Sequence, residues 1–418
     1  MISIKGIFKH IFYLLLLLLI TLLVLLSLKL IKPVEKIKIN RVLLSEVNNL
    51  TIDGQEFRDL NKNGQLDIYE DHRNLPRDRA NDLLRKMTLE EKVGQMFHPP
   101  FILKPDILMF LYEIAIRGNS STESQIIFDH ITHFNLYGNP TPAQLAKKIN
   151  SLQKTASRSR LGIPITISSD PIHEVPKGGG VASFSVDGFS KWPSQLGFAA
   201  TSNPKIIREF AEIVREEYLA VGIRTALHPM SDLATEPRWA RNFGTFGSNA
   251  EMSSKMTIEY MNGFQQKDIS NNSVLTMVKH FPGGGPQENG LDPHLFSGRN
   301  QIYPGDNFEY HLLPFREAIK NNLKVVMPYY GIPVGQTDED VAMAFNSYIL
   351  KDLLREELKF DGVICSDWGI ITGRHWGVDE LSIEQRYEKS IKAGIDQYGG
   401  EKDTNYLIDL VKNGQITE

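Results

Sequence analysis

The sequence predicts an α/β protein whose main part is a (β/α)8 TIM-barrel-like domain, preceded by a single transmembrane helix and an EF-hand-like calcium loop. Three observations support this fold class. Short apolar strands alternate with helical patterns after residue 84, an apolar run fills residues 11–28, and oxygen-bearing side chains recur at fixed spacing in residues 59–70. The predicted domains are an N-terminal segment (1–32), a linker with the loop (33–83) and the barrel domain (84–418).

The apolar run is interrupted only by Thr21 and Ser27. At about 1.5 Å per residue, a helix of this length spans roughly the hydrocarbon core of a bilayer. No small-residue cleavage site follows it, so it is interpreted as an uncleaved signal anchor rather than a cleaved signal peptide. The lysine count alone would keep the body inside, but a large domain can be translocated regardless of charge. We expect a single-pass, membrane-anchored protein with its body in the periplasm or outside the cell.

The loop at 59–70 has the ligand spacing of a calcium site, with Gly64 at the sixth position, where the chain must turn sharply. This spacing resembles that of EF-hand and dockerin-like loops. The plainer alternative is a solvated Asx turn, and a bound Ca²⁺ would be structural rather than catalytic. The predicted ligands are Asp59, Asn61, Asn63, the backbone carbonyl of Gln65, Asp67 and Glu70.

Eight short apolar segments after residue 84 are predicted to be strands. Amphipathic stretches such as 206–220 and 347–358 separate them and are typical of helices. This alternation predicts a closed parallel barrel, in which reactive side chains come from the carboxyl ends of the strands. The predicted strands are 93–96, 133–137, 165–168, 223–227, 275–278, 325–329, 362–366 and 394–398.

Polar side chains follow several of these strands at the point where each strand ends. Taken singly, such a residue is more often a helix cap or a loop hydrogen-bonder than a catalyst. Together they predict one pocket in which carboxylates meet Lys and His, which suits a polyhydroxylated substrate held by charge-assisted hydrogen bonds. The strand-end residues are Asp170, His228, Lys279, His280, Tyr330 and Asp367.

Charge and cysteine content exclude other classes of protein. The chain has 46 basic and 50 acidic residues, and no Lys/Arg block is long enough to follow a phosphate backbone, so no nucleic acid partner is expected. Cys365 is the only cysteine, which excludes an intramolecular disulfide and a Cys-based zinc site.

Several longer motifs occur in order along the barrel domain, and with them the sequence resembles the barrel domain of glycoside hydrolase family 3. The resemblance covers about residues 84–418. The motifs are Leu161-Gly-Ile-Pro-Ile followed by Asp170; Trp192-Pro193; residues 236–247, which contain Arg241; Lys279-His280-Phe281-Pro282-Gly283; residues 326–330, which end in Tyr330; and residues 360–368, which end in Ser366-Asp367-Trp368.

The resemblance implies roles for these residues. Asp367 of the Ser-Asp-Trp motif would be the catalytic nucleophile, and Asp170 would grip the far hydroxyls of the non-reducing terminal sugar. Tyr330 would lie near the nucleophile, and Trp368 would form an apolar wall. The implied substrate-binding residues are Asp170, Arg241, Lys279, His280, Tyr330 and Trp368.

The resemblance leaves the proton donor open. In larger family members the acid/base is a Glu on a second α/β domain downstream of the barrel, and we expect that domain to be absent from this chain. Single-domain β-N-acetylglucosaminidases of the family carry an Asp-Ser/Thr-His dyad in a barrel loop. Asp292-Pro293-His294 lies in the corresponding loop, although its spacing differs and proline replaces the hydroxyl residue. His294 is therefore the alternative acid/base.

The expected function is that of an exo-acting retaining β-glycosidase, first of all a β-glucosidase that hydrolyses terminal non-reducing β-D-glucosyl residues of an oligosaccharide or glycoside. Two alternatives stay open. One is a β-N-acetylglucosaminidase-like enzyme with His294 as acid/base, and the other is a non-catalytic carbohydrate-binding remnant. No cofactor is expected for catalysis, a structural Ca²⁺ is expected in the loop, and a C-terminal acid/base domain is an expected missing partner.

Overall fold

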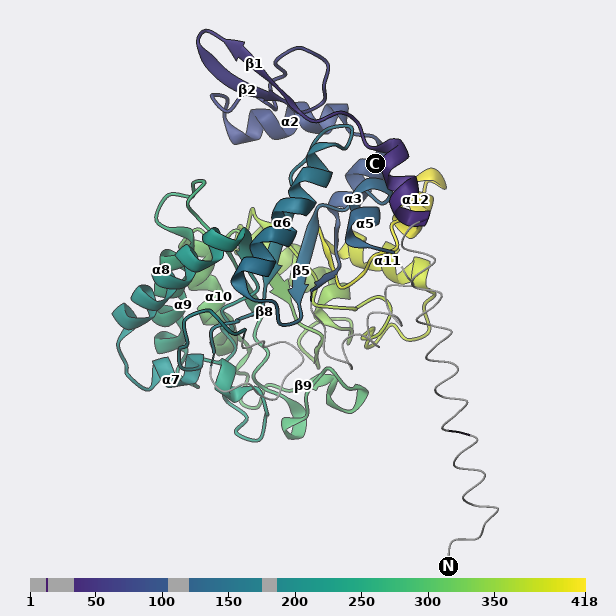
Figure 1. The fold of residues 1–418 in the computed structure, drawn as a ribbon. Coiled ribbons are helices and arrows are strands. Elements are labelled where there is room, and N and C mark those ends of the chain that lie inside the picture. Colours follow the sequence, from purple (N-terminus) through teal and green to yellow (C-terminus); the bar gives the residue numbers. More distant parts are fainter. Residues whose placement is uncertain (1–12, 14–33, 104–119, 175–185) are drawn as a thin grey trace, which may run out of the picture.

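A computed structural model describes residue 13 and residues 34–103, 120–174 and 186–418 of the chain. Its centre is a parallel sheet of seven strands in the order β12-β10-β8-β7-β6-β5-β4 (Figure 1). These strands are β4 (Pro100–Ile102), β5 (His133–Tyr137), β6 (Thr166–Ser169), β7 (Ile223–Ala226), β8 (Leu275–Phe281), β10 (Val325–Pro328) and β12 (Val363–Ile364).

Short pairings connect the two edges of this sheet. Cys365, directly after β12, forms a parallel bridge with Gln397. The next residues form β13 (Tyr398–Gly399), which pairs in parallel with β3 (Phe97–His98), and β3 leads through Pro99 into β4. The series of neighbouring parallel segments therefore returns to the edge where it began.

The predicted barrel needs correction in its strands. The sheet has seven strands rather than eight, and the segment 394–398 contributes only to the short β13. The segment 93–96 falls almost wholly in helix α3 (Leu89–Gln95), because Thr88 and Glu91 form a capping box that starts a helix there. An isolated apolar tetrapeptide does not distinguish the end of a helix from a strand.

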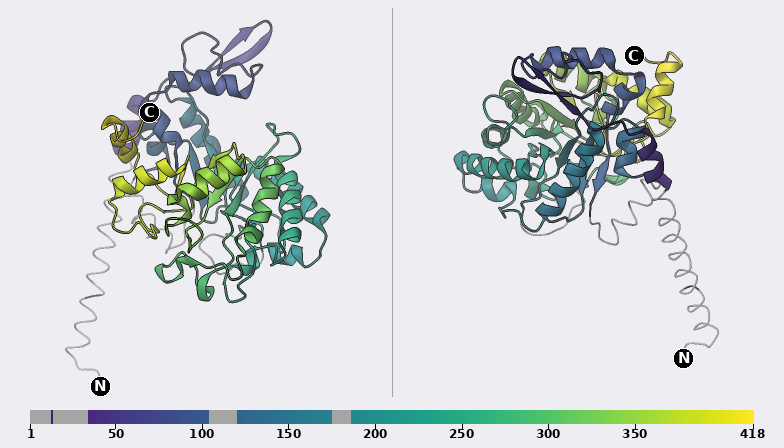
Figure 2. Two further views of the ribbon diagram at one scale, coloured as in Figure 1. Left: turned by 180° about the vertical axis from the view of Figure 1, so that it is seen from behind. Right: turned by 45° about the horizontal axis from the view of Figure 1, so that its top comes forward.

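Helices cover the outside of the sheet. α8, α9 and α10 lie side by side on one flank, while α11 and α12 contact each other on the opposite flank (Figures 1 and 2). The helix α8 ends at Gly222, whose φ of 92° is left-handed and where a Cβ would lie 2.9 Å from Ile149. The helices are α2 (Pro76–Lys86), α3, α5 (Thr122–Phe128), α6 (Pro142–Ser157), α7 (Gln195–Ala199), α8 (Pro204–Val221), α9 (Ala250–Gln265), α10 (Phe308–Lys320), η5 (Tyr348–Glu357), α11 (Ile383–Ala393) and α12 (Asn405–Lys412).

Several short elements lie in the connections between the strands and helices of the ring. Two of them, β9 (Asn300–Gln301) and β11 (Ile332–Pro333), pair in parallel with each other. The others are single helical turns: η1 (Asn242–Gly244), η2 (Glu288–Gly290), η3 (Phe296–Gly298) and η4 (Met343–Phe345).

Apolar side chains fill both faces of the sheet. In β10, Val325 and Met327 belong to one buried cluster and Val326 to another, as the alternation of side chains along a strand requires. The smaller cluster consists of Leu227, Met277, Val325, Met327 and Cys365, and the free Cys365 is completely buried in it. The larger cluster joins the strands to the surrounding helices.

A small N-terminal unit lies at one end of the molecule, opposite the end where β9 lies (Figures 1 and 2). It contains the antiparallel hairpin of β1 (Asn48–Ile52) and β2 (Gln55–Asp59) together with α2. Lys62, just after β2, donates from Nζ to the backbone carbonyls of Ser157 and Ser159 at 2.7 Å, where α6 ends. These bonds join the unit to the ring at the end away from the carboxyl ends of the strands.

The structure also corrects the predicted membrane anchor. None of the helices in the described ranges has both the length and the apolar character that a membrane crossing requires. The predicted segment, residues 11–28, lies outside the described residues except for Tyr13. The described residues therefore do not contain the predicted single transmembrane helix on which the predicted membrane-anchored location depended.

Candidate active site

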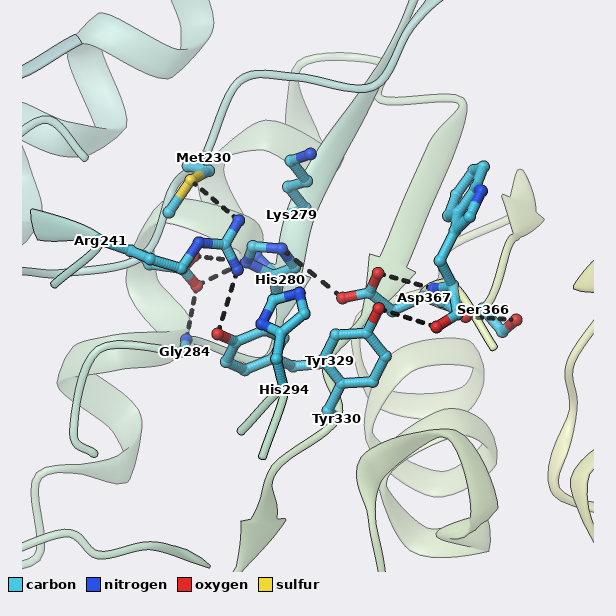
Figure 3. A network of polar contacts seen from close by, with 12 residues as sticks. Met230, Arg241, Lys279, His280, Gly284, His294, Tyr329, Tyr330, Ser366 and Asp367 are labelled. Atoms are coloured by element: carbon cyan, nitrogen blue, oxygen red, sulfur yellow. Dashed lines mark hydrogen bonds and ion pairs between the residues drawn. The ribbon is translucent and has the colours of Figure 1, made fainter. Parts of the chain in front are cut away.

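A cavity of about 590 Å³ opens at the carboxyl ends of the strands. It brings together the residues that the sequence predicted for substrate binding and catalysis, although they are far apart in the chain (Figure 3). Those residues are Asp170, Arg241, Lys279, His280, His294, Tyr330, Asp367 and Trp368.

Asp367 lines this cavity, and its two carboxylate oxygens differ in their contacts. Its Oδ1 accepts the backbone N–H of Trp368 at 2.7 Å. Its Oδ2 has no hydrogen-bond partner among the described residues and lies 3.7 Å from Nε2 of His280. The side chain is only 10% exposed. One oxygen is thus fixed by the backbone, while the other is buried beside His280 without a hydrogen-bond partner among the described residues.

Asp170 and Lys279 form a buried ion pair beside it. Nζ of Lys279 lies 2.9 Å from Oδ1 of Asp170, and Nδ2 of Asn135 donates to Oδ2 of Asp170 at 3.2 Å. Lys279 and His280 lie within β8, which continues beyond its predicted end, and the peptide bond between them is cis. Such a pair offers both hydrogen-bond donors and acceptors to hydroxyl groups.

Arg241 lies immediately before the short helix η1, and NH1 of its guanidinium donates to the Tyr329 hydroxyl at 3.1 Å. Burial by itself lowers the pKa of Arg241, but the neighbouring Tyr329, Asp292 and Asp367 outweigh this effect and raise the pKa. A guanidinium that is always charged can donate to hydroxyl oxygens in the cavity.

Tyr330 and Trp368 form a wall of the cavity. The Tyr330 hydroxyl donates to the backbone carbonyl of Trp368 at 2.9 Å, and Arg374 donates to the same carbonyl at 2.8 Å. The guanidinium of Arg374 also lies over the Tyr330 ring, 5.0 Å from its centre. Burial raises the pKa of Tyr330 well above its usual value, so its hydroxyl stays neutral.

His294 and Asp292 form a second acid–base pair at the cavity. Nδ1 of His294 lies 2.5 Å from Oδ1 of Asp292, and Trp239 donates from Nε1 to the other carboxylate oxygen at 3.2 Å. Burial by itself raises the pKa of Asp292, but the hydrogen bond and the charge of His294 outweigh this effect and lower the pKa. A histidine held at Nδ1 by a carboxylate has its Nε2 available for proton transfer.

His228 does not lie where the strand-end pattern predicts it, and Asp232 contacts a cavity residue although that pattern does not indicate it. His228 is buried between the hydroxyls of Tyr218 and Tyr260, at 3.0 and 2.5 Å, and does not line the cavity. Asp232, further along the same loop, contacts His280 instead. Asp232 lies several residues beyond the end of β7, and nothing local in the sequence shows that this part of the loop reaches His280.

Glu401 was also missed, although a signal for it existed. It lines the cavity and accepts the backbone N–H groups of Ile371 and Thr372 at 3.0 Å each. Glu401 is the first charged residue after the last predicted strand, as Asp170 and Asp367 are after theirs. The same search for polar residues at strand ends would therefore identify it.

The predicted calcium ligands do not fit a cation site as they are arranged. Oε1 of Glu70 accepts the backbone N–H groups of Leu60 and Asn61, at 2.7 and 3.1 Å, and Nζ of Lys86 lies 2.7 Å from Asp67. Nowhere in the described ranges do three or more His, Cys, Asp or Glu residues form a group that could hold a metal ion. The carboxylates instead bind N–H groups of the loop and an ammonium. The described residues thus give no support for a structural Ca²⁺ at the predicted ligands, which are Asp59, Asn61, Asn63, Gln65, Asp67 and Glu70.

A parallel α/β ring with a carboxylate-lined cavity at its strand ends is an architecture of glycoside hydrolases. The sequence profile described as "Glycosyl hydrolase family 3 N terminal domain" matches residues 88–418. The chain therefore belongs to glycoside hydrolase family 3.

Curated relatives are longer than this chain. Beta-glucosidase C of Emericella nidulans is 47% identical over 365 residues, which are 84% of this chain and 58% of that protein. The periplasmic beta-glucosidase/beta-xylosidase of Dickeya chrysanthemi is 38% identical over 397 residues, 88% of this chain and 60% of that protein. The chain thus spans about three-fifths of the length of these relatives.

Solved structures share the fold. The family 3 beta-N-acetylglucosaminidase of a Paenibacillus species aligns with a TM-score of 0.66 and 24% identity over 79% of this chain and 60% of the other. A beta-glucosidase of Listeria innocua in complex with glucose aligns with a TM-score of 0.65 and 22% identity over 82% of this chain and 45% of the other.

Proposed function

We propose that this protein is an exo-acting retaining β-glycosidase, and specifically a β-glucosidase that removes terminal non-reducing β-D-glucosyl residues. The observation that carries the proposal is that Asp367 lines the cavity while its Oδ2 has no hydrogen-bond partner among the described residues. A carboxylate oxygen without a hydrogen-bond donor keeps its lone pairs available for attack on carbon. The names of the relatives with 44–47% identity support glucose as the sugar.

In the proposed mechanism, Asp367 attacks the anomeric carbon through an oxocarbenium-like transition state and forms a covalent glycosyl-enzyme, which water then hydrolyses. The Trp368 backbone N–H holds Oδ1 in place, so that Oδ2 faces the substrate. Removal of a whole terminal sugar needs a closed end to the pocket, and the Asp170–Lys279 pair is proposed to bind its far hydroxyls. Arg241 and His280 are proposed to bind the hydroxyls between that end and the anomeric carbon.

The leaving oxygen needs a proton, and two sources are proposed. The first is an acid outside the family's N-terminal domain, in line with the greater length of the relatives. The second is His294, favoured by its bond to Asp292 and by its place at the cavity. The second source would make the mechanism similar to that of a β-N-acetylglucosaminidase of the family.

Asp367→Asn tests the proposed nucleophile. A 2-fluoro glucoside with an acidic phenol as leaving group should label Asp367 in the wild-type chain, because the covalent intermediate forms without help from an acid. The variant should lose both labelling and turnover. Asp403→Asn is the matched control, since Asp403 also lines the cavity, and it should still be labelled at Asp367.

Two results would contradict the proposal. Labelling at another residue would reject Asp367 as the nucleophile. A folded wild-type chain that binds glucose but releases no burst of phenol would favour the carbohydrate-binding remnant.

A further inference from the structure

We propose that Asp232 is a positioning residue that fixes the tautomer of His280, so that the ring presents Nε2 as a hydrogen-bond acceptor to one hydroxyl of the terminal sugar beside Asp367. The inference rests on the proposed function, because it assigns a sugar to the cavity. The sequence pattern does not indicate Asp232, and in this proposal Asp232 acts on the substrate through His280 rather than by touching it.

Asp232 is completely buried, and three hydrogen bonds hold its carboxylate. Oδ2 lies 2.7 Å from Nδ1 of His280, while Oδ1 accepts the backbone N–H groups of His280 and Gly284, at 3.0 and 2.5 Å. A Cβ at Gly284 would lie 2.9 Å from Oδ1 of Asp232 and 2.8 Å from the Tyr329 ring. Glycine at this position therefore lets the backbone N–H reach the carboxylate.

This contact determines which nitrogen of His280 carries the proton. An ionised carboxylate only accepts hydrogen bonds, so Nδ1 must be the protonated nitrogen. The ring is buried, and burial, together with the charge of Arg241, lowers the pKa of His280 well below its usual value. A neutral imidazole with its proton on Nδ1 has a lone pair on Nε2.

The position of Nε2 allows this lone pair to accept a hydrogen bond from a bound sugar. It lies 3.7 Å from Oδ2 of Asp367, too far for a hydrogen bond, and it lines the same cavity. A sugar hydroxyl can donate to Nε2 while the anomeric carbon of the same sugar faces Oδ2. In the other tautomer, Nε2 would carry a proton and could not accept a hydrogen bond from this hydroxyl.

Asp232→Asn separates positioning from structure. The amide keeps the size of the carboxylate, and its Oδ1 can still accept the two backbone N–H groups. Its Nδ2, however, donates where Oδ2 accepted, so His280 must move its proton to Nε2. In a Ser-His-Asp catalytic triad, the same substitution leaves the geometry intact but gives the histidine the wrong tautomer.

The experiment compares an activated aryl glucoside with its 2-, 3-, 4- and 6-deoxy analogues. For the parent glucoside, kcat/KM of Asp232→Asn should fall at least about tenfold. This is the effect expected when the sugar hydroxyl loses its hydrogen-bond acceptor. For the one analogue that lacks the hydroxyl bound by Nε2, the same substitution should cost little, because wild-type protein has already lost that bond. The other analogues should show the full loss.

Ser231→Ala is the matched control. Ser231 is buried in the same loop, but its hydroxyl bonds to Thr257 and not to His280. Its substitution should change kcat/KM by the same factor for every analogue. An equal loss on every analogue with Asp232→Asn as well would show a merely structural role and overturn the proposal.

A second readout does not depend on turnover. ¹⁵N NMR of the imidazole nitrogens, assigned with His280→Gln, should show His280 protonated at Nδ1 in the wild-type chain and at Nε2 in Asp232→Asn. Protonation at Nε2 in the wild-type chain would overturn the proposal even if the variant failed to fold. Failure of the glycosidase proposal would show instead as absent labelling of Asp367, with the tautomer of His280 unchanged.

Discussion

Nζ of Lys279 lies 2.9 Å from Oδ1 of Asp170, and the two side chains are only 6% and 7% exposed. Lys279 lies on β8 and Asp170 directly follows β6, so the pair crosses over β7, which lies between these strands in the sheet. A buried pair of this kind holds both groups in place, because each charge is costly to leave without its partner.

The first prediction concerns this pair. Asp170→Asn or Lys279→Met alone should each lower the free energy of unfolding by roughly 3–5 kcal/mol, since each leaves one buried charge unpaired. The double variant should lose clearly less than the sum of the two. Urea unfolding of the four proteins measures this coupling. Strictly additive losses would mean that the two charges do not stabilise each other.

The second prediction concerns the proton donor. If the acid lies outside the family's N-terminal domain, the 418-residue chain should cleave an aryl glucoside with an acidic phenol but be nearly inert on cellobiose. General acid catalysis contributes about 10²–10⁴-fold where the leaving group is basic. His294→Ala should then change neither rate by more than a few-fold.

The alternative has a different signature. If His294 is the acid, the wild-type chain should hydrolyse cellobiose, and His294→Ala should slow cellobiose far more than the aryl glucoside. Asp292→Asn should act in the same direction, because Asp292 holds Nδ1 of His294. This pattern in initial rates would contradict the first source of the proton and support the second.

The third prediction is an acid limb in the pH profile. Burial, offset in part by the backbone N–H groups of His280 and Gly284, raises the pKa of Asp232 to about 6. Below that pH the carboxyl becomes protonated and no longer accepts the Nδ1 proton of His280. The value of kcat/KM should therefore fall as the pH drops through about 6, and Asp232→Asn should remove this limb.

Few other groups around Asp232 can account for such a limb. Burial lowers the pKa of His311 to about 4, and the tyrosines and Arg241 do not change charge near pH 6. An acid limb at the same pH in Asp232→Asn would show that another group causes it. The titratable groups that face Asp232 are Arg241, His280, His311, Tyr303 and Tyr329.

The fourth prediction concerns the loop at 59–70. Calcium should leave the Tm of the chain unchanged within about 1 °C, because a ligand stabilises only a fold that binds it, and here Lys86 and loop N–H groups occupy the carboxylates. Thermal scans with calcium and with EDTA measure this. A calcium-dependent rise in Tm that disappears in Glu70→Ala would restore the calcium site.

The sequence alone determined the main catalytic candidates. Asp170 and Asp367 stand directly after short apolar segments, and parallel strands bring their carboxyl ends to one edge of a sheet. This prediction needs only local pattern and chain direction, and both residues line one cavity even though the predicted strand bounds differ from the observed ones by a few residues. Lys279 and His280 were identified in the same way, although β8 extends past both of them.

The tertiary structure decided what local pattern does not contain. Both His228 and Asp232 belong to the loop after β7, but only the path of that loop buries the first between two tyrosines and brings the second to His280. The loop at 59–70 has the spacing of calcium ligands, yet the carboxylate of Asp67 forms an ion pair with Lys86 of helix α2. In both cases the partner of a polar group comes from another helix or strand. Sequence spacing therefore predicts which groups are available, whereas folding decides which partner each group meets.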